Sequence, residues 1–254
     1  MNTVTNATEK GMNLEVKGII IKTVDYKDSD KIVTILTDNM GKISAKAQGA
    51  RRKSSRLTAA VQPFTYCSFQ LFEMNGKYKI DEADVITQFM SKNMDIVKIA
   101  LASYFCEIAS MEMEHETGDD SLLRLMLNCF YAIDNDIHTM QRIKSAFELK
   151  CACFWGYTPR LTASESLTRE NIAINFEDGT LAPRNIFTRG TMLSRNALSA
   201  VNFICNADLK KMLSFKISSE EEDELSRFAE GYILDKMEYK PKTLTFYQSL
   251  DFEV

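Results

Sequence analysis

A run of positive charge between residues 41 and 56 is the clearest chemical feature of this 254-residue sequence. The run holds no acidic residue and six basic ones, which are Lys42, Lys46, Arg51, Arg52, Lys53 and Arg56. Because the whole chain carries a net charge of −4, the residues outside this run sum to −10. Clusters of Lys and Arg commonly bind nucleic acids or other polyanions. A solvated loop that only keeps the protein in solution is the alternative interpretation.

Three further lysines precede the run and extend the candidate set for phosphate contacts. The candidates are Lys22, Lys27, Lys31, Lys42, Lys46, Arg51, Arg52, Lys53 and Arg56. Proteins that bind single strands also stack bases on aromatic side chains. Tyr26 and Tyr66 are the candidates for this role, although Tyr66 could equally belong to the hydrophobic core.

The residues from 15 to about 86 have the pattern of short β-strands, rich in β-branched residues and separated by turn signals. We predict strands at residues 16–24, 31–37, 42–48, 64–72 and 77–86. Asn75-Gly76 is a strong hairpin signal, and the basic cluster at 51–56 falls in the connection before the fourth strand. Five short antiparallel strands predict a small closed barrel of the OB-fold type. An SH3-like barrel is the structural rival.

From about residue 93 the apolar residues recur at helical spacing. We predict helices at about 93–111, 121–133, 140–154, from about 195, at 209–215 and at 218–237, and an extended tail at 243–246. Residues 157–190 lack this periodicity and are predicted to be irregular. The prediction is therefore an α+β protein with a flexible tail at 1–12, an OB-fold domain at 13–90 and an α-helical domain at 91–254.

Composition and charge divide the chain into two parts. Residues 1–90 contain 13 Lys and Arg against 10 Asp and Glu, a net charge of +3, whereas residues 91–254 contain 18 against 25, a net charge of −7. This asymmetry predicts two modules with different partners. The sequence shows no apolar run long enough to cross a bilayer, no signal peptide and no disulfide framework. We therefore expect a cytoplasmic protein with no membrane partner.

The sequence shows no motif for catalysis. Its two histidines, His115 and His138, belong to no HExxH arrangement, and neither a GxSxG motif nor a P-loop is present. The acidic run at residues 220–224 is typical of the first turn of a helix rather than of a metal site. These features favour a binding protein that is not an enzyme.

Residues 18–37, 41–45, 49–52 and 57–64 closely resemble the RecO family of bacterial recombination mediators, and the resemblance continues more weakly to residues 155–161 and 240–246. The resemblance implies an N-terminal OB domain and a C-terminal helical domain. It also implies binding to single- and double-stranded DNA, annealing of complementary strands, and partnership with RecR and the C-terminal tail of SSB. Through these partners it implies help with RecA loading at gaps, and a place at the nucleoid.

Many members of that family carry a zinc site of four cysteines in two Cys-x-x-Cys pairs. The matching positions here are Ser164, Leu167, Ala182 and Asn185. Leucine and alanine cannot ligate zinc, so we predict that the chain lacks this zinc and has no cofactor.

Three hypotheses of function remain. The leading one is a non-catalytic DNA-annealing mediator. The main rival is a protein-interaction adaptor with an OB-like barrel whose DNA binding is incidental. The third is a magnesium-dependent nuclease that would use acidic residues of the helical half.

Overall fold

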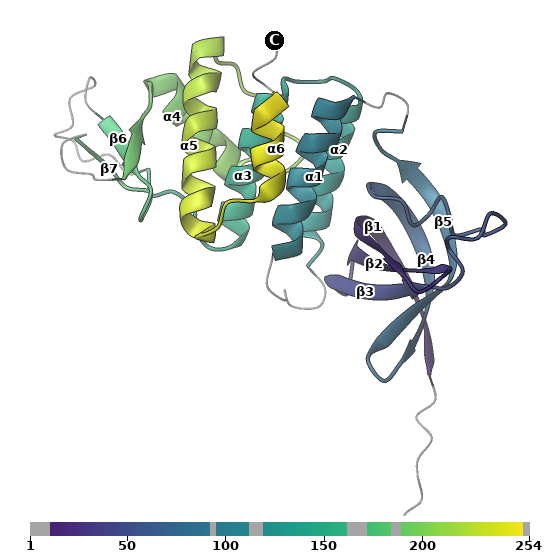
Figure 1. Ribbon diagram of the computed structural model, residues 1–254. Helices are drawn as coiled ribbons and strands as arrows, with labels where there is room; N and C mark the ends of the chain where they lie inside the picture. Colours follow the sequence, from purple (N-terminus) through teal and green to yellow (C-terminus); the bar gives the residue numbers. More distant parts are fainter. Residues whose placement is uncertain (1–10, 92–94, 112–118, 162–171, 184–188, 251–254) are drawn as a thin grey trace, which may run out of the picture. The chain divides into compact units, whose positions relative to one another are not determined.

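The computed structural model (Figure 1) describes residues 11–91, 95–111, 119–161, 172–183 and 189–250. The chain divides into two compact units. The first comprises residues 1–94 together with 106–123, and the second comprises residues 95–105 together with 124–254.

Five strands of the first unit form a closed barrel in the order β1-β2-β3-β5-β4. The strands are β1 (Met12–Tyr26), β2 (Asp30–Thr37), β3 (Lys42–Ala47), β4 (Thr65–Met74) and β5 (Lys77–Gln88). The expected OB-type barrel is confirmed, but the all-antiparallel prediction was wrong, because β3 and β5 pair in parallel. A parallel pair joins strands that are distant in sequence, so hairpin signals do not reveal it.

The strand boundaries differ from the prediction mainly in β1, which begins at Met12 rather than at residue 16. Met12, which we placed in the flexible tail, is therefore part of the barrel, whereas residues 1–10 lie outside the described residues. The predicted hairpin at Asn75-Gly76 is confirmed. Both residues have positive φ, at 54° and 71°, as a type I′ turn requires.

The barrel core combines alternate strand residues with part of the β3–β4 connection. Val33, Ile35 and Phe69 are fully buried inside the barrel. The connection adds four more members to the same core, which are Ala50, Leu57, Ala60 and Val61. The segment that follows the basic run is thus packed against the barrel, whereas the basic side chains themselves are exposed.

Helices dominate the second unit (Figure 1). They are α3 (Met140–Phe154), α4 (Arg195–Asn206), α5 (Ser219–Met237) and α6 (Lys242–Leu250), while α1 (Ile96–Met111) and α2 (Ser121–Asp134) contribute residues to both units. Helix α3 is central to its unit, because it packs against both α4 and α5 and is buried at every residue from Ile143 to Ala152. Among the described residues, no helix is both long and apolar enough to span a membrane.

The interval that we predicted to be irregular contains a small antiparallel sheet. Strands β6 (Ile172–Asn175), β7 (Leu181–Pro183) and β8 (Gly190–Met192) pair in the order β7-β6-β8. The turn between β6 and β7 includes Gly179, at φ +68°. Strands of three or four residues leave too short a pattern for recognition of their period.

Two predictions near the C-terminus were wrong. Residues 209–215 form turns closed by bonds such as Lys211 N–H to Asp208 O (2.8 Å), not a helix. Residues 243–246 lie in α6 rather than in an extended tail. The preceding Pro241 is compatible with a helix start, since the first turn needs no bonded N–H at that position. The predicted helix start at Ser218 is confirmed by a complete capping box with Glu221.

Candidate nucleic-acid interface

An irregularity in β1 turns a row of side chains onto the outer face of the barrel. Val16 and Ile20 alternate into the core, so regular alternation would also place Lys22 inside. The pairing register with β2 shifts between Ile20 and Lys22, as in a β-bulge. Beyond the shift, Lys22, Val24 and Tyr26 are all exposed.

The outer residues of neighbouring strands continue this row across the barrel. Val24 is opposite Ile32 of β2, which is opposite Lys46 of β3, and Lys46 is opposite Lys79 of β5. Val24 is 50% exposed and Ile32 is partly exposed. We call this set, with Lys22 and Tyr26, the outer face. It combines apolar surface with cations, which is the combination that single-stranded nucleic acids require.

The basic residues of the β3–β4 connection form a second surface, which we call the basic platform and define as Arg51, Arg52, Lys53 and Arg56. All four side chains are exposed, although the apolar residues around them are buried in the barrel core. Their backbone is held by turn hydrogen bonds, such as Ser55 N–H to Arg52 O at 3.0 Å. The platform is therefore anchored on one side and open on the other.

Asp30 anchors the platform to the β1–β2 hairpin. Its Oδ1 accepts a hydrogen bond of 2.7 Å from the amide of Gly49, and its Oδ2 lies 3.0 Å from Lys46 Nζ. The Gly49 amide and Lys46 together lower the pKa of the Asp30 carboxyl. A second link is the hydrogen bond from Arg51 N–H to Ser29 O at 3.0 Å.

Asp25, on the same hairpin, interacts with two of the predicted phosphate contacts. Lys31 Nζ is 3.1 Å and Arg51 Nε is 3.3 Å from its carboxylate oxygens. The hydrogen bond from Lys31 and the charge of Arg51 lower the pKa of Asp25. Three predicted contacts, Lys31, Lys46 and Arg51, are thus engaged with acidic side chains of the protein itself.

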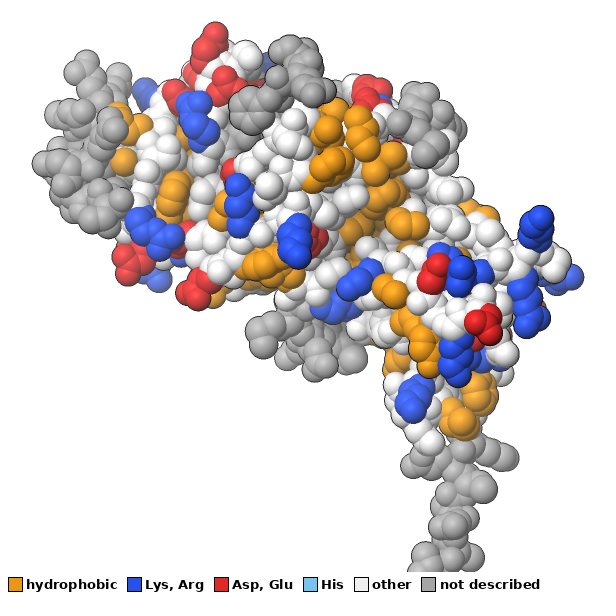
Figure 2. Space-filling view, viewed as in Figure 1, with side chains coloured by type: hydrophobic (Ala, Val, Ile, Leu, Met, Phe, Trp, Pro, Cys, Tyr) orange, Lys and Arg blue, Asp and Glu red, His pale blue; other side chains and the backbone are white. Residues whose placement is uncertain are grey.

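The other predicted cations are distributed around this region. Lys42 is the first residue of β3. The remaining five have no carboxylate within ion-pair distance among the described residues, and these are Lys22, Lys27, Arg52, Lys53 and Arg56. Figure 2 shows Lys and Arg side chains gathered over the barrel part of the chain.

The structure separates the two candidate aromatic residues. Tyr26 belongs to the outer face, is 42% exposed, and has Lys27 Nζ and Lys46 Nζ at 5.4 and 6.0 Å from its ring centroid. Tyr66 of β4 is paired with Ile19 of β1. Ile19 precedes Tyr26 by seven residues, so the two candidate tyrosines are separated by roughly 20 Å along β1. Burial raises the pKa of Tyr66. Tyr26 alone is grouped with the cations.

Sequence reasoning missed three members of the outer face, which are Val24, Ile32 and Lys79. The two aliphatic residues have the residue type of core positions, and the bulge that exposes Val24 has no local sequence signal. Lys79 joins Lys46 only through the parallel β3–β5 pairing. Its ammonium forms an ion pair of 2.8 Å with Asp81.

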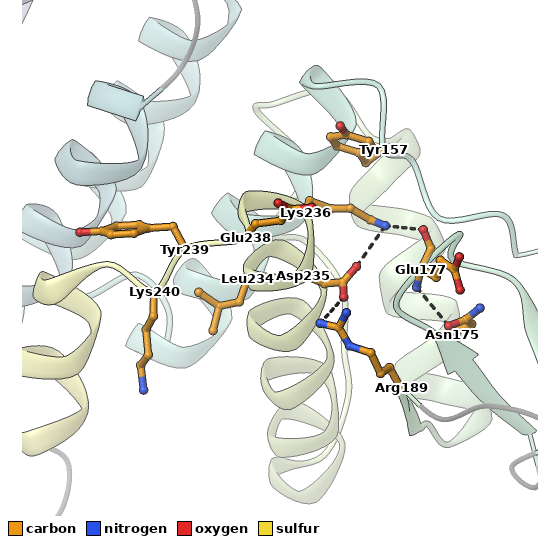
Figure 3. A pocket seen from close by; sticks show the side chains of 10 residues that line it. All are labelled: Tyr157, Asn175, Glu177, Arg189, Leu234, Asp235, Lys236, Glu238, Tyr239 and Lys240. Atoms are coloured by element: carbon orange, nitrogen blue, oxygen red, sulfur yellow. Dashed lines mark hydrogen bonds and ion pairs between the residues drawn. The ribbon is translucent and has the colours of Figure 1, made fainter.

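An open pocket of about 900 Å³ lies in the second unit, between α5 and the small sheet (Figure 3). Asp235 and Lys236 of α5 occupy its centre, where Asp235 forms an ion pair with Arg189 at 2.5 Å and Lys236 donates to Glu177 O at 2.5 Å. Figure 3 shows Tyr239 and Lys240 pointing away from this cluster. Three cations and three acids line the pocket, so its charges are balanced, unlike those of the basic platform.

A largely buried charge cluster in the second unit is centred on Lys144 and Glu148 of α3. Lys144 Nζ lies 2.8 Å from Glu148 and 2.7 Å from Glu230, and the Tyr104 hydroxyl donates to Glu148 Oε1 at 2.8 Å. Burial raises the pKa of Glu148 to about 7, against the opposing effect of Lys144. The other carboxylate oxygen of Glu148, Oε2, is buried and has no hydrogen-bond partner in the described part of the chain.

The positions that would match a zinc site fall mostly outside the described residues. Ser164, Leu167 and Asn185 are not described, and Ala182 lies in β7. The absence of zinc therefore stays a prediction.

Comparison with known proteins identifies both halves of the chain. The family model for the recombination protein O N-terminal domain matches residues 12–89, and the model for the C-terminal domain matches residues 93–245. The chain is 29% identical to the DNA repair protein RecO of Clostridium perfringens over 238 residues, which cover 91% of this chain and 96% of that protein. It is also 29% identical to the DNA repair protein RecO of Acetivibrio thermocellus, over 94% of this chain and 97% of that protein.

The two family models meet between the barrel and the helical part, and together they cover nearly all of the sequence. The first matches the barrel that carries the outer face and the basic platform. The chain belongs to the recombination protein O family of DNA repair proteins.

Proposed function

We propose that this chain is a non-catalytic DNA-binding mediator of recombinational repair. It binds single- and double-stranded DNA through the barrel and anneals complementary strands. With RecR it helps RecA to load at gaps coated by SSB, whose C-terminal tail it contacts through the helical half. Its place of action is the nucleoid, in the cytoplasm. The partner proteins come from the family resemblance, and the DNA-binding part is supported by the geometry of the barrel.

One observation carries the DNA-binding proposal, namely that the outer face and the basic platform lie on the same OB barrel. OB folds bind nucleic acids on the face of strands β2 and β3 and on the loops beside it. The outer face includes Ile32 of β2 and Lys46 of β3, and the platform is fastened to the β1–β2 hairpin by Asp30. Cations can therefore follow the sugar-phosphate backbone while Tyr26 and Val24 contact the bases.

The five cations without a carboxylate partner set the expected salt dependence. Each phosphate neutralised on a single strand contributes about −0.7 to the slope of log K against log salt concentration. Five contacts would give a slope of roughly −3.5. Such binding does not depend on base sequence, since phosphates carry no sequence information.

The test compares two double variants with the same net charge. Arg52→Ala/Lys53→Ala removes two platform cations, and Lys210→Ala/Lys216→Ala removes two exposed lysines of the second unit. Measured by fluorescence anisotropy on a labelled single strand, the platform variant is expected to lose about 1.4 units of salt slope. It should also anneal complementary strands more slowly, whereas the control variant should match the unmodified protein.

Equal losses in both variants would mean that only the net charge matters. Absence of salt-sensitive binding in the unmodified protein would favour the alternative function, a protein-interaction adaptor in which the barrel contacts an acidic protein. Cleavage of the strand in the presence of magnesium would contradict a non-catalytic role.

A further inference from the structure

The Asp25 carboxylate lies between two cations at the edge of the candidate DNA-binding surface. Its Oδ1 is 3.1 Å from Lys31 Nζ, and its Oδ2 is 3.3 Å from Arg51 Nε. Lys31 and Asp25 are also direct cross-strand neighbours in the β1–β2 ladder. Two cations that converge on one oxyanion make a site that a phosphate group could equally occupy.

The Arg51 guanidinium is positioned independently of Asp25. Its Nη1 donates to the carbonyl oxygens of Lys27 at 3.3 Å and Asp28 at 3.4 Å. The Arg51 backbone N–H donates to Ser29 O. Loss of Asp25 would therefore leave the guanidinium in place, with its Nε edge open to another acceptor. Guanidinium groups bind phosphate oxygens strongly and with two parallel hydrogen bonds.

Asp25 and Asp30 differ in how firmly they are held. The Asp30 side chain is only 11% exposed and accepts a backbone amide, so it belongs to the structure of the platform. The Asp25 side chain is 55% exposed, and its partners Arg51 and Lys31 are 40% and 19% exposed, so the pair with Arg51 is the more open of the two. Exposed ion pairs are weak and screened by salt, so an incoming polyanion can replace the carboxylate.

We propose that Asp25 is an internal competitor of DNA. In the free protein its carboxylate occupies the position at which Lys31 and Arg51 together would hold one backbone phosphate, and a bound strand displaces it. This inference rests on the proposed DNA-binding function. Asp25 then limits affinity, because two cations must exchange an internal anion before they contact DNA, and keeps binding readily reversible.

The experiment compares Asp25→Asn with Asp28→Asn in the full chain. Asp28 lies three residues away on the same hairpin, is exposed, and has no ion pair among the described residues. Both variants remove one negative charge, but only Asp25→Asn releases Lys31 and Arg51. We expect Asp25→Asn to bind a labelled single strand about three- to tenfold more tightly than Asp28→Asn at low salt, with a salt slope steeper by about 0.7 to 1.4.

A double-mutant cycle identifies the released cation. In an Arg51→Ala background, Asp25→Asn should lose most of its gain in affinity, because the group that it frees is absent. Equal affinity and slope for Asp25→Asn and Asp28→Asn would overturn the inference, as would weaker binding by Asp25→Asn. If Arg52→Ala/Lys53→Ala still weakens binding in either case, the proposed function stands and only the role of Asp25 fails. If the unmodified protein binds no DNA, both fail.

Discussion

Of the two candidate stacking residues, Tyr26 is the one that the fold places among cations. It lies on the outer face next to the β1–β2 hairpin, with Lys27 and Lys46 near its ring. The next residue, Lys27, has a positive φ of 52° and begins the three-residue turn between β1 and β2. A base that stacks on Tyr26 would therefore have its phosphate close to positive charge.

Replacement of Tyr26 by Ala should weaken binding to single-stranded DNA by about 1–2 kcal/mol, because a stacking platform is lost. Tyr26→Phe should retain most of the affinity, since stacking needs the ring and not the hydroxyl. Tyr131→Ala, at a 58% exposed tyrosine on α2, is the control. Titration of a fluorescent oligonucleotide measures all three. An unchanged affinity for Tyr26→Ala would mean that the barrel binds only phosphates.

At the scale of elements, the β3–β4 connection can present the basic platform because it is attached to the barrel. Its apolar residues close the barrel core, and the bond from the Gly49 amide to Asp30 fixes the start of the basic platform. The charge of this segment is evident in the sequence. Its attachment is not, because Asp30 precedes Gly49 by 19 residues and the contact exists only after β2 and β3 have paired.

Asp30→Asn should loosen the platform, because the amide that replaces the carboxylate loses the ion pair with Lys46 and binds the Gly49 amide less strongly. Limited trypsin digestion reports this directly, since Arg52 and Lys53 are cleavage sites. We expect about three- to tenfold faster cleavage there than in the unmodified protein. Asp28→Asn, on the same hairpin, should be cleaved at the normal rate. Equal cleavage of the two variants would show that the platform is held by its apolar residues alone.

The difference between contacts that are local in sequence and contacts between distant residues also explains which elements the sequence predicts. The hairpin at Asn75-Gly76 and the capped helix start at Ser218 follow from residues that are close in sequence, and both are confirmed. The parallel β3–β5 pair depends on residues that are distant in sequence. The strands of the small sheet are too short to show a period, and α6 lies where we predicted an extended tail.

For the whole molecule, the two units differ in where their charged side chains lie. The barrel keeps its basic platform exposed, whereas the helical unit contains a Lys144–Glu148–Glu230 cluster in which Lys144 and Glu148 are buried. Glu230 and Glu148 together raise the pKa of Lys144 despite the opposing effect of burial. Glu148 is the member whose charge is least favoured, because it is fully buried and one of its oxygens has no partner among the residues that the structure describes.

The stability of the helical unit should therefore depend on pH. In the folded protein the pKa of Glu148 is raised to about 7, so the folded state retains a proton that the unfolded state loses near pH 4.3. The free energy of unfolding should fall as pH rises between these values. Relative to Glu148→Gln, the unmodified protein should lose about 2–3 kcal/mol between pH 5 and pH 8.

Urea denaturation followed by the fluorescence of Trp155 measures this effect, since Trp155 is the single tryptophan and caps the end of α3. Glu82→Gln, at an exposed position of β5, is the control and should follow the pH profile of the unmodified protein. A parallel pH profile for Glu148→Gln would show that Glu148 is ionised in the folded protein throughout this range.

The shift of register in β1 makes the length of this strand matter more than the identity of its surface residues. Removal of Thr23, which follows the shift, would move Val24 and Tyr26 by one position in the strand and turn both from the outer to the inner side of the barrel. Substitution at either position alters a single contact, whereas deletion of one residue moves every side chain that follows it in the strand to the opposite side of the sheet. The protein would then keep its net charge and its basic run, but Val24 and Tyr26 would no longer belong to the outer face.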